Sequence, residues 1–336
     1  MSETHSLMTA SHRMHAIVHR QYGTPDVLAY EEIARPVPGD TEVLVRVYAA
    51  GASVGDHHIV TGKPYVIRPS VGGLLRPGHL VPGSAMAGRV AAVGAQVTAF
   101  RPGDDVYGET IHGAFAEYVV VPGARLAPKP RNLSFEEAAA TPWAVTPLQA
   151  LRDAGGLKAG QHVLINGASG GVGSWAVQIA KALGARVTAV CSTRNVARMR
   201  ALGADEVIDY TTADFVDGGP RFDVMLDTVG NRSVLECRSV LVPTGTFVSC
   251  SGGTSGTRWL VRLVWMLLVS RFTSQKLKPF IVRLNQKDLL VLTELVEAGK
   301  IKPVIERRYA LRDVADALRH VGEGHAQGQT VIHIAD

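Results

Sequence analysis

The fold is decided by Val163–Asn195, VLINGASGGVGSWAVQIAKALGARVTAVCSTRN, which has the pattern of an apolar strand, a small-residue cluster, an amphipathic helix and a second strand. Within it Ala168, Gly170 and Gly173 have the G-x-G-x-x-G spacing, with alanine in the first place. The first small residue permits a sharp turn, Gly170 lets the backbone approach a pyrophosphate, and Gly173 lets the helix pack on the strand. The stretch predicts a dinucleotide-binding unit.

The amino end of the helix after these glycines is expected to hold the phosphates of the dinucleotide. Free N–H groups and the positive end of the helix dipole both favour an anion there. The residues expected to contact the phosphates are Ala168, Ser169, Gly170, Gly171 and Val172.

The second strand of this unit ends without an acidic residue. An NAD-selective unit carries Asp or Glu about 20 residues after the glycines, where it accepts hydrogen bonds from the ribose 2′-OH. The corresponding residues are Ser192, Thr193, Arg194 and Asn195. A carboxylate would repel a 2′-phosphate, whereas hydroxyls and a guanidinium donate to it, so we expect NADPH rather than NADH. The alternative is that Ser192 and Asn195 merely cap the next helix.

The wider pattern predicts an α/β protein with two domains. From His15 to Val121, short alternating strands separated by Pro/Gly turns indicate a compact β-barrel-like unit. After Gly160, strands alternate with helices, which predicts a doubly wound parallel sheet. The expected division is a disordered lead over 1–13, a catalytic domain over 14–145 and 281–336, and a dinucleotide-binding domain over 146–280.

Composition narrows the classes of function. The net charge of +5 comes from scattered basic residues, so nucleic-acid binding is not expected. The three isolated cysteines fit a reducing compartment, and no signal peptide is visible, so we expect a cytoplasmic protein. The apolar segment Trp259–Val269 is too short to span a bilayer. It is expected to be a buried or half-buried helix, with a membrane or partner surface as the alternative.

Several motifs resemble the zinc-independent quinone oxidoreductase branch of the medium-chain dehydrogenase/reductase superfamily, over a match from about Met14 to the C-terminus. They are GASGGVGSWAVQIAKALGA, LGADEVIDY, PGSAMAGRVAAVG, RPGDDVYG, GAFAEYVVVP and PGARLAPKP. The resemblance implies a GroES-like β-barrel catalytic domain, a Rossmann domain that binds NADPH, and an active cleft between them. It also implies a homodimer formed by pairing of Rossmann-sheet edges. Further cofactor contacts implied by it are Tyr210 at the adenosine phosphate, Thr146 at the nicotinamide, and Ser251 and Gly252.

No metal site is expected. The zinc-dependent relatives need a thiolate and a His-Glu pair, but the corresponding stretch RPGHLVPGSAMAG offers only His79. Asp56, His57 and His58 are potential ligands, yet adjacent residues on a strand would point to opposite faces.

The function expected from these observations is hydride transfer from NADPH to a quinone or an α,β-unsaturated carbonyl, without zinc. The segment GASVGDHHIVTGKPYVIRP offers Ser53, Asp56 and Tyr65 as catalytic candidates. The segment carries Gly55 close to where many relatives have an Asn-Pro pair, so the relatives' roles do not transfer directly. In the alternative interpretation Asp56 caps a turn and Tyr65 belongs to the core. Two other functions stay open, a trans-2-enoyl-thioester reductase and a non-catalytic NADPH-binding redox sensor.

Overall fold

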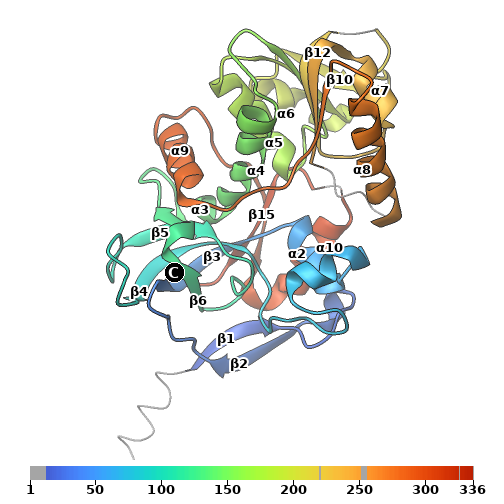
Figure 1. Cartoon of the computed structure of the whole chain (residues 1–336). Helices are drawn as coiled ribbons and strands as arrows, with labels where there is room; N and C mark the ends of the chain where they lie inside the picture. Colours follow the sequence, from blue (N-terminus) through green and yellow to red (C-terminus); the bar gives the residue numbers. More distant parts are fainter. Residues whose placement is uncertain (1–12, 219–220, 251–255, 325, 336) are drawn as a thin grey trace, which may run out of the picture. The chain divides into compact units, whose positions relative to one another are not determined.

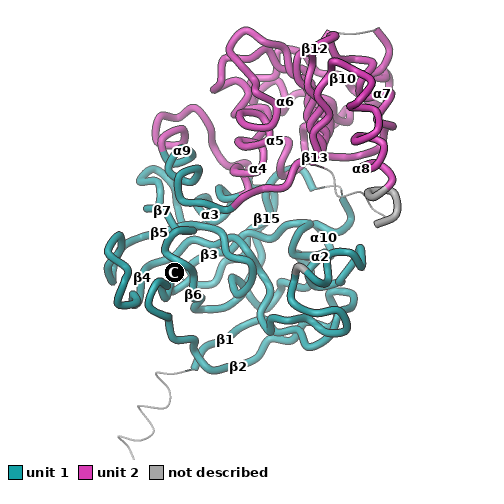
Figure 2. The backbone as a smooth tube through the Cα atoms, viewed as in Figure 1, with its two compact units in different colours: residues 1–142, 284–293, 305–336 teal, residues 143–283, 294–304 magenta. Residues whose placement is uncertain are grey.

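The computed structural model describes residues 13–218, 221–250, 256–324 and 326–335. The contacts within the chain divide it into two compact units (Figure 2). Unit 1 comprises Met1–Pro142, Leu284–Thr293 and Ile305–Asp336, and unit 2 comprises Trp143–Arg283 and Glu294–Val304.

The described part of unit 2 is built on a six-stranded parallel sheet (Figure 1). Its strands are β8 (His162–Asn166), β9 (Arg186–Cys191), β10 (Glu206–Asp209), β11 (Phe222–Asp227), β12 (Leu241–Ser249) and β13 (Lys276–Pro279). Their order is β10-β9-β8-β11-β12-β13, the doubly wound order in which the chain reverses direction between β8 and β11. The predicted doubly wound parallel sheet is confirmed.

Helices connect these strands. They are α4 (Val145–Gln149), a π-helical turn (Ala150–Ala154), α5 (Gly171–Ala182), α6 (Val196–Ala201), α7 (Val234–Ser239) and α8 (Gly256–Ser270). Helix α5 buries its apolar face, which includes Trp175 and Ile179. Helix α7 begins with a capping box, in which Ser233 and Glu236 each accept a hydrogen bond from the other's backbone N–H.

Unit 1 is mostly antiparallel sheet. Its strands are β1 (Arg13–Val18), β2 (Ala29–Ala34), β3 (Glu42–Ala52), β4 (Ala85–Val93), β5 (Asp105–Glu109), β6 (Tyr118–Pro122), β7 (Leu126–Pro128), β14 (Ile305–Ala310) and β15 (Gln329–His333). Strands β1 and β2 pair with each other, and a larger sheet runs β14-β15-β3-β4-β5-β7, with β6 also paired to β3.

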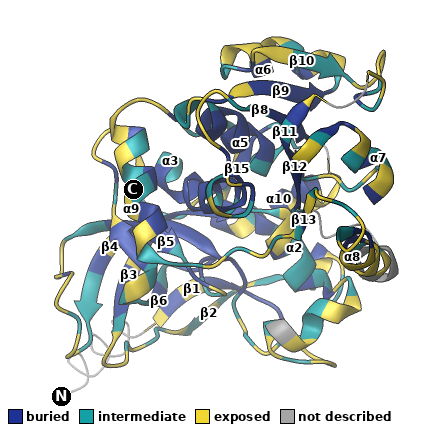
Figure 3. Ribbon diagram, turned by 45° about the horizontal axis from the view of Figure 1, so that its top comes forward, coloured by how far each residue is buried: buried dark blue, intermediate teal, exposed yellow. Residues whose placement is uncertain are grey.

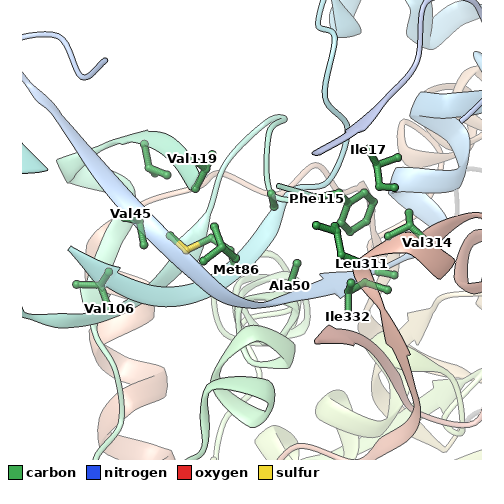
Figure 4. Packing of buried hydrophobic residues seen from close by; sticks show 14 of the residues in the cluster. Ile17, Val45, Ala50, Met86, Val106, Phe115, Val119, Leu311, Val314 and Ile332 are labelled. Atoms are coloured by element: carbon green, nitrogen blue, oxygen red, sulfur yellow. The ribbon is translucent and has the colours of Figure 1, made fainter. Parts of the chain in front are cut away.

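Short helices complete unit 1. They are α2 (Val54–Thr61), α3 (Phe135–Ala140), α10 (Val314–Gly322), the first part of α9 (Gln286–Glu297) and 3-10 turns at Pro25–Val27, Tyr65–Val71, Gly123–Arg125, Pro142–Ala144 and Leu311–Asp313. The core gathers side chains from the strands and from α10, among them Met86, Phe115, Val314 and Ile332 (Figure 4). Burial of such aliphatic and aromatic side chains stabilises a domain by about 1.5–3 kcal/mol each.

The contacts divide the chain differently from the expected domain boundaries. Residues 294–304 belong with unit 2, because the side-chain amide of Gln178 holds the backbone of Lys302 through two hydrogen bonds of 3.0 and 2.9 Å. The amide of Gln149 holds Arg283 in the same way, at 2.7 and 3.0 Å. The expected lead over 1–13 lies outside the described residues, except that Arg13 is the first residue of β1. None of the described helices is both long and apolar enough to cross a bilayer.

Candidate functional site

The turn between β8 and α5 is sharper, and lies one residue earlier, than the sequence predicted. Gly167 has φ +83°, and a Cβ there would approach Thr228 Oγ1 to 2.4 Å. Ala168 is buried, and its N–H donates to the carbonyl of Val190 on β9 at 3.0 Å. Assigning the turn to Ala168 was wrong, because only Gly167 adopts a backbone conformation that favours glycine.

The next two glycines have different structural roles. A Cβ on Gly173 would lie 2.1 Å from the carbonyl oxygen of Gly167, so the helix approaches the turn only because Gly173 has no side chain. A Cβ on Gly170 would meet just one atom within 4 Å, that same oxygen at 3.6 Å. Crowding by the protein therefore explains Gly173, whereas the protein around Gly170 leaves room for a side chain.

The N-terminus of α5 is partly exposed. Gly170 is its N-cap residue and provides no side-chain hydrogen bond. Ser169, Gly170, Gly171 and Val172 are all partly exposed. A helix start without a side-chain cap presents N–H groups and the positive end of the helix dipole, which is a favourable site for a phosphate.

The end of β9 brings hydroxyl groups and an arginine to the surface. Thr193 and Arg194 are exposed, and Ser192 is half-buried. Thr193 Oγ1 lies 2.9 Å from Thr211 Oγ1, and Tyr210 N donates to the Cys191 carbonyl at 3.0 Å. Because β9 and β10 run side by side, the exposed ring of Tyr210 belongs to the same edge of the sheet as Arg194.

Asn195 is 2% exposed and supports this edge from inside. Its Nδ2 donates to Ser192 Oγ at 3.2 Å, and its Oδ1 accepts from Arg198 at 2.9 Å. Ser192 and Asn195 occupy the N-cap positions of the 3-10 turn Thr193–Asn195 and of α6, as the alternative interpretation expected, but neither makes a side-chain capping bond there. Burial also leaves Asn195 without the exposed surface that direct contact with a cofactor requires.

Sequence reasoning missed a polar network where the sheet order reverses. Asn166 Nδ2, at the end of β8, donates to Asp227 Oδ1 at the end of β11 and to Asn231 Oδ1, both at 2.9 Å. Asp227 is fully buried, and its second oxygen is paired with Arg262 from α8. Ligands of doubly wound sheets bind outside the strand ends at this reversal point.

Thr146, the residue expected at the nicotinamide, is half-buried on α4 of unit 2. Ser251 and Gly252 lie outside the described residues, immediately after Cys250.

In unit 1, Asp56 is the acceptor at the centre of a hydrogen-bonded cluster. Ser53 N and Ser53 Oγ donate to its Oδ2 at 2.9 and 2.8 Å, and Ser84 Oγ donates to its Oδ1 at 2.8 Å. Ser53 and Asp56 form the capping box of α2, and Asp56 has no exposed surface. Of the two interpretations of Asp56 that the sequence left open, the structure shows the cap.

A second carboxyl group, Glu109 at the end of β5, interacts with Asp56. Burial raises the pKa of Asp56 to about 6, although the hydrogen bonds from Ser84 and Ser53 oppose the rise. Burial raises the pKa of Glu109 to about 8, and the negative charge of Asp56 adds to that rise. Glu109 is therefore mostly protonated at neutral pH and is able to donate a hydrogen bond.

The remaining candidates of unit 1 do not join this cluster. Tyr65 is 66% exposed, so the interpretation that it is a core residue is wrong; its ring lies 4.6 Å from the guanidinium of Arg68. His57 and His58 lie on α2, not on a strand as expected, and His57 Nδ1 is 3.0 Å from the carbonyl of Leu318. His79 stacks on His112, with ring centroids 3.4 Å apart.

Within the described ranges no three His, Cys, Asp or Glu side chains are arranged so that they could hold a metal ion. The three cysteines are free thiols. Burial raises the pKa of Cys191 to about 11 and the pKa values of Cys237 and Cys250 to about 12, so these thiols are poor nucleophiles.

The parallel sheet, the glycine turn and the start of α5 define the class of fold, a dinucleotide-binding unit that is accompanied by a separate β-rich unit. Residues 39–131 match the family model for the alcohol dehydrogenase GroES-like domain, and residues 202–332 match that for zinc-binding dehydrogenases. The chain belongs to the medium-chain dehydrogenase/reductase superfamily, in its quinone oxidoreductase branch. The predicted family and the predicted GroES-like and Rossmann folds are confirmed.

Similar proteins match over almost the whole chain. A 2-methylene-furan-3-one reductase of Solanum lycopersicum is 34% identical over 99% of this chain and 82% of its own length. A chloroplast envelope quinone oxidoreductase homolog of Arabidopsis thaliana is 31% identical over 95% of this chain and 98% of its own. The solved structure of the quinone oxidoreductase from Coxiella burnetii superposes with a TM-score of 0.83 at 29% identity, covering 96% of this chain and 99% of that one.

Proposed function

We propose that this protein is an NADPH-dependent reductase that transfers hydride to a quinone or to the β-carbon of an α,β-unsaturated carbonyl. The observation that carries the proposal is the combination of an uncapped α5 N-terminus with an exposed, acid-free Ser192-Thr193-Arg194 segment after β9. Family membership supports the class of reaction. The names of relatives support the acceptor, since they include an NADPH-dependent alkenal/one oxidoreductase of Arabidopsis thaliana that is 31% identical.

The turn around Gly170 fits a pyrophosphate. The bare Cα of Gly170 faces space that the protein leaves open, which is the condition for close approach by phosphate oxygens. Ala168 is buried, so its expected contact is restricted to the backbone, whereas the N–H groups at the start of α5 supply the charge-favoured donors. These residues bind and orient the cofactor and take no part in the chemistry.

The segment after β9 fits the 2′-phosphate of NADPH. Across the described residues, Arg194 has neither a hydrogen bond nor an ion pair within the protein, so its guanidinium is available to a ligand. The nearby carboxylate of Asp209 is engaged by the N–H and hydroxyl of Thr211 at 3.0 and 2.7 Å. We assign Ser192, Thr193, Arg194 and Tyr210 to this phosphate, with Asn195 as a positioning residue behind Ser192.

Bound NADPH supplies the hydride. In unit 1, the hydroxyls of Ser53 and Ser84 donate to Asp56, which fixes their positions. We therefore propose Asp56 as a positioning residue rather than a group that touches the acceptor. Burial raises the pKa of Glu109 to about 8, so this carboxyl group is mostly protonated at neutral pH. Tyr65 is exposed and stays a candidate for contact with the acceptor.

The proposal extends to assembly and location. The homodimer implied by the family would pair the β13 edges of two sheets, and β13 is one of the two edge strands of the described sheet, with β10 at the other edge. It carries Lys276 and Lys278, which would face like charges in a partner and weaken pairing at low ionic strength. Three free thiols fit a reducing compartment such as the cytoplasm.

The experiment is an assay of NADPH consumption against a panel of quinones and enones, followed by the absorbance of the reduced nicotinamide. The proposal predicts turnover with at least one acceptor, faster with NADPH than with NADH. Tight NADPH binding without turnover of any acceptor would contradict it and favour a redox sensor.

A further inference from the structure

Helix α8 exposes an apolar face that none of the residues described by the structure covers. Val261, Val264, Trp265 and Leu268 follow one another at helical spacing and are 46–56% exposed; Phe272, just after the helix, is 86% exposed. The spacing places them in one stripe, which we call the α8 stripe. A neighbouring side of the helix carries the buried Met266 and Val269, which belong to the core of unit 2. Figure 3 shows much of α8 in the colour of exposed residues.

A buried ion pair fixes which side of α8 faces outward. Arg262 pairs with the fully buried Asp227 at the end of β11, and its Nη1 donates to the carbonyl of Arg232 at 2.6 Å. Its guanidinium also lies 5.3 Å from the ring centroid of Phe247 on β12. A rotation of α8 that buried the stripe would break this ion pair, so the pair keeps the stripe exposed to solvent. Exposure of apolar side chains to water is unfavourable, and binding of a partner surface would remove that unfavourable exposure.

The sequence around α8 is strongly cationic. Residues 237–287 contain eight Lys and Arg and no Asp or Glu, whereas the rest of the chain carries 27 Lys and Arg against 30 Asp and Glu. The net positive charge of the protein therefore comes from this segment, and not from basic residues scattered evenly along the chain as the sequence analysis assumed. In space, Arg271 and Lys276 are exposed at the end of α8 and on β13, which packs against α8. Arg238 of α7 bonds to Thr273 and Gln275 just after the helix, at 2.8 and 2.9 Å.

We propose that the α8 stripe inserts into the surface of an anionic lipid bilayer, with α8 lying in the plane of the membrane. An apolar stripe flanked by cations matches a bilayer, which offers an apolar layer beneath negative headgroups. Trp265 suits this position because indole favours the lipid–water boundary. A second copy of this chain is a poorer occupant, since it would bring two acid-free cationic segments face to face. The inference goes beyond the proposed reaction and does not depend on it.

The test is co-sedimentation of the full chain with phosphatidylcholine vesicles, with and without phosphatidylglycerol. We expect binding to the vesicles that contain phosphatidylglycerol and little to the others. Leu268→Glu should weaken that binding about tenfold or more, because a buried leucine contribution is lost and a negative charge is added. Lys276→Glu should weaken it several-fold through charge alone.

Leu75→Glu is the matched control, since Leu75 is 89% exposed, lies in unit 1 and undergoes the same change of side chain. It should bind the anionic vesicles as the wild type does. Circular dichroism shows whether each variant is folded, and light scattering measures its oligomeric state. Absence of binding to anionic vesicles, or equal binding by Leu268→Glu and the wild type, would overturn the proposal. A wild-type oligomer that Leu268→Glu dissociates would also overturn it, because the stripe would then be covered by a second copy.

Discussion

The backbone N–H of Tyr210 donates to the carbonyl of Cys191 at 3.0 Å, just beyond the last parallel pairing of β10 with β9. This bond joins two loops that are far apart in the chain, the one that carries Arg194 and the one that carries Tyr210. A guanidinium, two hydroxyls and a phenol therefore belong to one edge of the sheet. On this edge we base the preference for a phosphorylated cofactor.

Replacing Arg194 by alanine should weaken the use of NADPH and spare that of NADH. Loss of a charge-assisted contact with the 2′-phosphate costs about 1–3 kcal/mol, or roughly five- to 150-fold in KM. Steady-state kinetics with each cofactor measures these changes in KM. Arg200→Ala, an exposed arginine on α6, is the control and should change neither KM. An equal loss with both cofactors would remove Arg194 from the phosphate site.

Gly170 and Gly173 should respond oppositely to the same substitution. Gly173→Ala places a Cβ 2.1 Å from a carbonyl oxygen and should lower the free energy of unfolding by about 1–3 kcal/mol. Gly170→Ala finds room within the protein and should change it by less than about 0.5 kcal/mol. Yet it should weaken cofactor binding, because the methyl group occupies the space left for the pyrophosphate. Denaturant unfolding measures the stability of each variant, and calorimetry measures its affinity for the cofactor. A Gly170→Ala variant that binds the cofactor as the wild type does would show that the space beside Gly170 is not the pyrophosphate site.

The pH dependence of stability should report Glu109. Its folded-state pKa of about 8 lies above the ordinary value of 4.5, so the folded protein binds more protons than the unfolded chain between those values. The free energy of unfolding therefore falls as the pH rises through that window and stops falling above about pH 8. Asp56 contributes in the same direction only up to about pH 6. The histidines whose pKa burial lowers, among them His112, contribute in the opposite direction up to about pH 7, so Glu109 is isolated only by comparing the wild type with a variant that lacks its carboxyl group.

Glu109→Gln removes the titrating group and should remove its contribution to the fall in stability between pH 6 and 8. The same change at the exposed Glu323 serves as the control and should leave the profile as it is. Urea unfolding at several pH values provides the measurement. Identical pH profiles of Glu109→Gln and the wild type between pH 6 and 8 would contradict the assignment.

Removing Arg262 should destabilise unit 2 strongly. Arg262→Met leaves the buried carboxylate of Asp227 without its cation, which costs about 3–5 kcal/mol. The double variant with Asp227→Asn should recover part of that loss, because the uncompensated charge is gone. Arg271→Met, at the exposed end of α8, should cost less than about 0.5 kcal/mol. Similar stabilities of the two single variants would show that the pair does not anchor α8.

The features that sequence predicts best here are local. Alternation of strands and helices after Gly160 predicted the parallel sheet, and α5 follows the glycine cluster as the predicted amphipathic helix. The glycine spacing located the turn between β8 and α5, but it did not identify the residue with positive φ. Both Gly167 and Ala168 are small, and only the backbone angle distinguishes them.

The features that sequence missed depend on contacts between distant residues. Nothing near Arg262 indicates that Asp227 neutralises it, because the partners are 35 residues apart and meet only after β11 and α8 have packed. Glu109 and Asp56 likewise come from different elements, and their shared burial sets their pKa values. Asp56 was correctly considered as a cap because the capping box is a local pattern, with Ser53 three residues earlier.

The proposal that this protein binds NADPH in preference to NADH is tested most directly by calorimetric titration of the wild-type protein with each cofactor. We expect one NADPH to bind per chain, at least about tenfold more tightly than NADH. This ratio corresponds to about 1.4 kcal/mol of binding free energy from the 2′-phosphate contacts. Binding of neither cofactor to the folded protein, or tighter binding of NADH, would contradict it.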